Sequence, residues 1–87
     1  MLFINFGDQE ALACLKAIKV LRSNGIKAEL YPDAAKMKKQ MNYANRRNIP
    51  YVVLIGDEEL KTDTFTLKHM ESGEQSIVSL DHLIDQF

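Results

Sequence analysis

The sequence of 87 residues lacks the features that small proteins use for cross-linking, for crossing a membrane and for export. Its single cysteine, Cys14, excludes an internal disulfide and a metal site built from several thiolates, and fits a reducing compartment. Apolar runs such as residues 52–55 are far too short to cross a bilayer, so we expect no membrane partner. The start of the chain lacks the cationic segment and apolar stretch of a signal peptide, which favours a cytoplasmic protein.

What remains is the composition of one soluble globular domain over residues 1–87, with 46% hydrophobic and 26% charged residues. The net charge of −1 gives no overall attraction to nucleic acid. Residues 34–56 nevertheless contain five basic side chains and no acidic one, and acidic residues follow at 57–59. A solvated helix face is the plainer interpretation of such a run, and a phosphate-binding surface is the other.

The first two thirds of the chain alternate between apolar strands and helical patterns. Strands are expected at residues 2–6, 27–31 and 51–55. A first helix should be capped by Asp8, carry Cys14 on an inward stripe with Leu15 and Val20, and end at Asn24-Gly25. A second helix is expected at about residues 34–47. Its inward residues should be Met37, Met41 and Ala44, and its outward residues Lys38, Lys39, Asn42 and Arg46.

The pattern changes after Gly56, where the acidic residues 57–59 suggest a solvated turn. Residues 63–70 and 75–80 alternate as strands of a hairpin around Ser72-Gly73. A last short helix, capped by Ser79 or Asp81, should turn three side chains toward the sheet: Leu83, Ile84 and Phe87.

This order predicts an α/β fold with three layers, α/β/α. Right-handed crossovers place the first strand between the second and third, with one helix on each face. The hairpin then extends a mixed five-stranded sheet of order 2-1-3-4-5, in which only strand 4 is antiparallel to the others.

No catalytic constellation emerges from these elements, so we expect this segment alone not to be an enzyme. His69 and His82 are the only histidines, and both are predicted to be surface residues. The chain has no Cys-x-x-Cys and no glycine-rich phosphate-binding motif, and we expect neither a metal nor a cofactor in this domain.

Binding of single-stranded RNA has more support. Ligands of open α/β sheets collect beyond the carboxyl ends of the parallel strands, where the second helix also begins. Lys36 and Lys39 lie at that helix start, where phosphate is the expected partner. Glu59 can accept hydrogen bonds from guanine amino and imino groups, and Lys68 can donate to a base carbonyl.

Five segments, each weak alone, together resemble the carboxy-terminal anticodon-binding domain of class II aminoacyl-tRNA synthetases, most closely that of histidyl-tRNA synthetase. They are Leu21-Arg22-x-x-Gly25-Ile26-x-Ala28-Glu29, Lys38-Lys39-Gln40-x-x-Tyr43-Ala44, Ile49-Pro50-Tyr51-Val52-Val53, Ile55-Gly56-x-x-Glu59-Leu60 and Leu67-Lys68-x-Met70-x-Ser72-Gly73-Glu74-Gln75. The resemblance implies the same mixed sheet and a tRNA anticodon stem-loop as partner. It also implies that Glu59 and Lys68 contact anticodon bases, and Gln75 is a further RNA-contact candidate.

The resemblance further implies a segment excised from the carboxy terminus of a larger histidine–tRNA ligase, with an added Met1. ATP and magnesium would then act only in the missing catalytic domain. The parent enzyme is expected to be a homodimer and the isolated domain a monomer. Two alternatives stay open: the matching domain of a threonyl-, prolyl- or glycyl-tRNA synthetase, and a protein-interaction or regulatory domain that kept the fold without RNA binding.

Overall fold

The computed structural model describes residues 1–87 and contains five strands and four helices. In chain order these are β1 (Leu2–Phe3), α1 (Asp8–Ser23), β2 (Glu29–Leu30), α2 (Met37–Arg46), β3 (Tyr51–Leu54), α3 (Asp57–Thr62), β4 (Phe65–His69), β5 (Gln75–Val78) and α4 (Leu80–Gln86).

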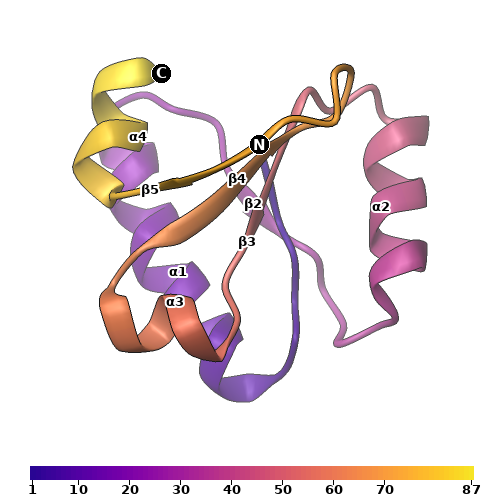
Figure 1. Ribbon diagram of the computed structural model, residues 1–87, viewed down its shortest axis with the longest axis horizontal. Coiled ribbons are helices and arrows are strands. Elements are labelled where there is room, and N and C mark those ends of the chain that lie inside the picture. Colours follow the sequence, from indigo (N-terminus) through magenta and orange to yellow (C-terminus); the bar gives the residue numbers. More distant parts are fainter.

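The strands form one mixed sheet of order β2-β1-β3-β4-β5, which confirms the predicted topology (Figure 1). β1 pairs in parallel with β2 and with β3, and the register places Leu2 opposite both Glu29 and Val52. β4 is antiparallel to β3 and to β5, so β5 runs in the same direction as β3. The carboxyl ends of β1 and β3 therefore meet at one edge of the sheet, where α1 and α3 begin.

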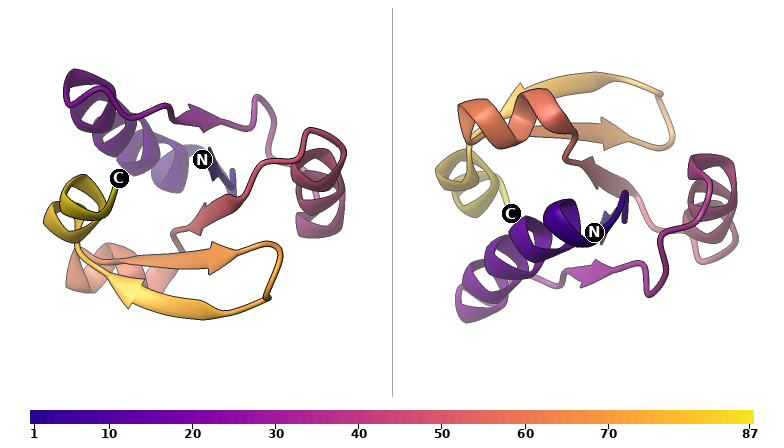
Figure 2. Two further views of the ribbon diagram at one scale, coloured as in Figure 1. Left: turned by 90° about the horizontal axis from the view of Figure 1, so that it is seen from above. Right: turned by 90° about the horizontal axis from the view of Figure 1, so that it is seen from below.

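Alternating side chains of the central strands build two separate cores. On one face, Phe3, Val53 and Leu67 pack with buried residues of α1 and α4, among them Cys14 and Leu83. On the other face, Leu2, Ile4 and Val52 pack against Ala44 of α2. Figure 2 shows the resulting layers, with α1 and α4 on one side of the sheet and α2 on the other. The predicted three-layer architecture is therefore confirmed.

Two helix starts differ from the expectation. Gly7, not Asp8, is the N-cap of α1, and its φ of 140° is a conformation that residues with a Cβ rarely adopt. Asp8 is the first helical residue and makes no cap hydrogen bond, although its charge still complements the helix dipole. α2 begins at Met37 rather than near residue 34, and Met37 is exposed rather than inward.

The acidic segment after β3 is the helix α3, not a turn. Gly56 precedes it as N-cap, and Asp57, Glu58 and Glu59 occupy its first turn, where carboxylates are favourable to the dipole. Asp63 ends the helix in the left-handed conformation, with φ 56°. Six residues are too few to produce a helical period, which is why the sequence pattern did not reveal α3.

Other local predictions hold. Asn24 ends α1, and Gly25 follows with φ 76°. Ser79 caps α4 by accepting from the His82 amide at 3.1 Å. Leu83 is fully buried and Ile84 partly buried, whereas Phe87 is 42% exposed and packs its ring edge on Tyr51.

Candidate nucleic-acid interface

The hairpin of β4 and β5 leaves one of its two faces uncovered. Its other face is buried, since Phe65, Leu67 and Val78 belong to the core beneath α1 and α4. α2 packs on β1 and β3 and does not extend over the hairpin (Figure 2). We call the uncovered surface the open hairpin face; it consists of Thr66, Lys68, Gln75 and Ile77.

Strand register brings two of the predicted RNA-contact residues together on the open hairpin face. Lys68 of β4 is directly opposite Gln75 of β5, so both side chains emerge on the same side of the sheet. Thr66 is opposite Ile77 in the same way, and Ile77 is 73% exposed. The face thus offers a cation, an amide, a hydroxyl and an apolar side chain within two adjacent residue pairs.

Glu59 joins this face from α3. Its Oε1 accepts a hydrogen bond from the Thr66 hydroxyl at 2.8 Å, and Thr66 and Lys68 lie on the same side of β4. Asp57 and Glu58, the other acids of this helical turn, are exposed. The structure therefore gathers Glu59, Lys68 and Gln75 into one region and leaves the neighbouring carboxylates outside it.

Lys36 and Lys39 lie apart from the hairpin, at the start of α2. Lys36 is the N-cap residue, Lys39 belongs to the first turn, and both side chains are exposed. Figure 1 shows α2 starting at the same sheet edge at which α3 lies. The first turn of a helix presents amides without intrahelical partners, so this end suits a phosphate group.

A buried polar network that sequence reasoning missed fixes α2 to this edge. Gln40 is fully buried; its Oε1 accepts from the Asn5 amide at 2.7 Å, and its Nε2 donates to the carbonyls of Asn5 and Ala35, each at 2.8 Å. The Asn5 side chain donates in turn to the Tyr31 carbonyl at 3.0 Å. The sequence feature that could have predicted this network is a glutamine on the inward stripe of α2, one turn before Ala44.

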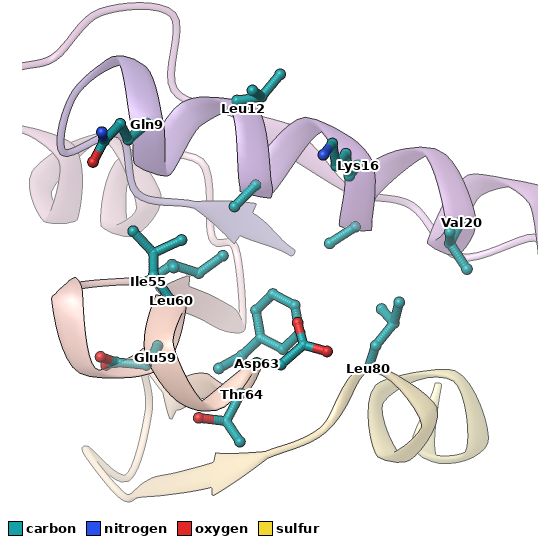
Figure 3. A pocket seen from close by; sticks show the side chains of 13 residues that line it. Gln9, Leu12, Lys16, Val20, Ile55, Glu59, Leu60, Asp63, Thr64 and Leu80 are labelled. Carbon is teal, nitrogen blue, oxygen red and sulfur yellow. The ribbon is translucent and has the colours of Figure 1, made fainter.

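The opposite side of the molecule carries an apolar groove of about 440 Å³ between α1, α3 and α4 (Figure 3). Leu12, Val20 and Leu60 are among its lining residues and remain exposed, at 58%, 38% and 36%. Lys16 and Asp63 are its charged lining residues besides Glu59, whose carboxylate is bonded to Thr66. The expectation that Leu15 and Val20 would be buried is wrong, because the short strands β1 and β2 cannot cover the whole apolar stripe of α1.

The titratable groups elsewhere do not form a reactive constellation. Burial raises the pKa of the Cys14 thiol to about 12, with a smaller contribution from Glu10, so the predicted buried cysteine is confirmed. Burial also lowers the pKa of the Met1 amino group, which the charge of Glu29 partly opposes. No group of three or more His, Cys, Asp or Glu side chains is arranged to hold a metal ion.

The two histidines occupy different environments. His82 is exposed, as predicted. His69 is half-buried rather than a free surface residue, because its ring stacks on Tyr51 with centroids 4.9 Å apart and its Nδ1 lies 2.9 Å from the Ser72 hydroxyl.

None of the helices is long and apolar enough to span a membrane.

Comparison with known proteins matches residues 2–87 to the family model described as "Anticodon binding domain". Histidine–tRNA ligase of Christiangramia forsetii is 61% identical over 83 residues, which cover 95% of this chain and 18% of that protein. Histidyl-tRNA synthetase from Nostoc sp. PCC 7120 superposes with a TM-score of 0.90 at 28% identity, over 98% of this chain and 20% of that one. Apo histidyl-tRNA synthetase of S. aureus superposes with a TM-score of 0.84 at 38% identity, over 99% of this chain and 25% of that one. The chain therefore spans about a fifth of the length of the curated relatives it matches.

Proposed function

The chain belongs to the family of anticodon-binding domains, and on that premise we propose that it recognises the anticodon stem-loop of a histidine tRNA within a histidine–tRNA ligase. One observation carries the proposal: a chain that matches this family along nearly its whole length gathers a carboxylate, an ammonium and an amide on one uncovered face. In the proposed role it holds the tRNA in place for aminoacylation by a catalytic part that binds ATP, magnesium and histidine. We propose a homodimeric cytoplasmic parent enzyme and a monomeric isolated domain.

The chemistry of the open hairpin face suits base recognition more than phosphate attraction. Glu59 is repelled by phosphate, so its favourable contacts with RNA must be with base donors such as the guanine amino and imino groups. Lys68 donates to a base carbonyl, and the Gln75 amide both donates and accepts. Lys36 and Lys39 supply attraction to phosphate from the start of α2, apart from this face.

A binding titration against anticodon stem-loops of histidine, threonine, proline and glycine tRNAs tests the proposal. The chain should bind the histidine stem-loop most tightly. Preference for another member of the panel would assign the domain to a sister synthetase. No binding to any stem-loop would contradict RNA recognition and favour a protein-interaction role.

Substitution of Glu59 ties this preference to the site. Glu59→Ala should reduce the free-energy preference for the histidine stem-loop by about 1–3 kcal/mol, while affinity for the other loops holds or rises. Lys68→Ala should weaken both the preference for the histidine stem-loop and the affinity for all stem-loops, because lysine is a base donor and a cation. Glu58→Ala is the matched control, since it removes the same charge from an exposed neighbour in the same helical turn. An equal loss from Glu58→Ala would refute base reading by Glu59.

A further inference from the structure

We propose that Thr66 is a positioning residue for anticodon recognition, which fixes the Glu59 carboxylate in the orientation that reads a base. The inference rests on the proposed function, in which Glu59 is the acceptor for base donors. It begins from the single side-chain hydrogen bond between α3 and β4, from the Thr66 hydroxyl to Glu59 Oε1 at 2.8 Å.

Glu59 is held through its side chain, unlike the acids beside it. The amide of Thr64 donates to its backbone carbonyl at 3.1 Å, and Thr66 donates to its side chain. Asp57 and Glu58 are exposed, and neither has a side-chain bond of this kind. The three acids of α3 carry equal charges, but only the side chain of Glu59 is held in one orientation by a hydrogen bond.

The hydroxyl of Thr66 is well suited to hold a carboxylate still. A β-branched residue has a restricted χ1, so β4 sets the direction of the hydroxyl. In the sheet register, Thr66 lies between Leu54 of β3 and Ile77 of β5. The hydrogen bond is partly buried, which strengthens it relative to a fully exposed one.

One carboxylate oxygen of Glu59 stays available to a ligand. Thr66 occupies a lone pair of Oε1, whereas Oε2 lies above Gly56, 3.5 Å from the position that a Cβ there would take. A freely rotating glutamate would have to be ordered when RNA binds, and ordering one such side chain weakens binding by up to about 10-fold. With Thr66 in place, the Glu59 side chain is already ordered before RNA binds. The resulting gain in affinity applies only to bases that donate to this carboxylate.

The test compares Thr66→Val, which keeps the shape and removes the donor, with Thr66→Ser, which keeps the donor. The readout is the ratio of affinities for the histidine anticodon stem-loop and for variants with one anticodon base changed. Thr66→Val should lower this ratio about 3- to 10-fold, and Thr66→Ser should keep it within about 2-fold. Thr64→Val is the matched control, because the Thr64 hydroxyl pairs with that of Thr62 at 2.7 Å. Thermal unfolding establishes that each variant is folded, and Thr66→Ala replaces the valine variant if it is not.

Combination with Glu59→Ala separates this inference from the function on which it rests. In the Glu59→Ala background, Thr66→Val should change the ratio no further, since its effect passes through the carboxylate. An undiminished effect there would show that Thr66 contacts the base itself and would overturn the positioning role. If Glu59→Ala lowers the ratio and Thr66→Val does not, the positioning role is wrong and base reading by Glu59 stands. If Glu59→Ala itself has no effect, the failure belongs to the proposed function.

Discussion

At the scale of single residues, Cys14 shows how burial alone decides chemistry. The side chain is fully buried in the core beneath α1, and its sulfur lies 3.9 Å from the Ile4 carbonyl oxygen. Burial raises the pKa of the thiol to about 12, so the reactive thiolate is scarce at neutral pH. The stripe of small and apolar residues on α1 predicts this inert state from the sequence.

Cys14 should therefore resist thiol reagents in the native state. At pH 8 we expect its labelling to require unfolding and to be far slower than that of the denatured chain. The raised pKa also stabilises the native state below the pKa of about 8.5 in the unfolded chain, and this contribution is lost as the pH rises toward 12. Wild type should thus lose more stability than Cys14→Ala between pH 8 and pH 10.5, measured by urea unfolding. Equal losses, or rapid native labelling, would contradict burial of the thiol.

At the scale of elements, α2 depends on one polar side chain for its placement. Gln40 makes three hydrogen bonds inside the protein, two with the backbone of Asn5, which follows β1, and one with the Ala35 carbonyl just before α2. The same bonds hold Lys36 and Lys39 at the edge of the sheet. Packing of Ala44 and Met41 fixes the helix against β1 and β3, and the glutamine fixes its end.

Replacing Gln40 with leucine should cost roughly 2–4 kcal/mol in the free energy of unfolding, because the Asn5 amide and two carbonyls lose their buried partners. Asn42→Leu on the exposed side of α2 is the matched control and should change stability little. Urea denaturation of both variants measures the difference. A leucine variant as stable as the wild type would show that the network does not anchor the helix.

The lysines at the start of α2 should act on phosphate without reading sequence. Lys36→Ala or Lys39→Ala should weaken all stem-loops alike. Each should also flatten the log–log dependence of affinity on salt, by about 0.7 for every phosphate of single-stranded RNA that the lysine no longer neutralises. Lys19→Ala, an exposed lysine of α1 on the other side of the sheet, should leave the slope unchanged. A change in preference among stem-loops would instead assign these lysines to base recognition.

At the scale of the whole molecule, the sheet order and layers were predictable because hydrophobic alternation and crossover handedness leave few other arrangements. Glu59 and Lys68 were assigned by resemblance, and register explains why Lys68 and Gln75 share a face. The helix α3, the Gln40 network and the Thr66 bond were not predicted, because each depends on contacts between segments rather than on a local pattern. The apolar groove also escaped prediction, since the stripe of α1 does not reveal how much of it the sheet can cover.

The molecule therefore presents two unlike surfaces on opposite faces of the sheet, an open hairpin face with polar groups and an apolar groove, and α3 borders both. The central claim is that RNA binds to the first. Its most direct test is a titration of the isotope-labelled chain with the histidine anticodon stem-loop, followed by NMR of the backbone amides. We predict that the largest shift changes fall on α3, β4, β5 and the first turn of α2, while Leu12, Lys16 and Val20 stay unchanged. Changes confined to α1 and α4, or none at saturating RNA, would contradict this account.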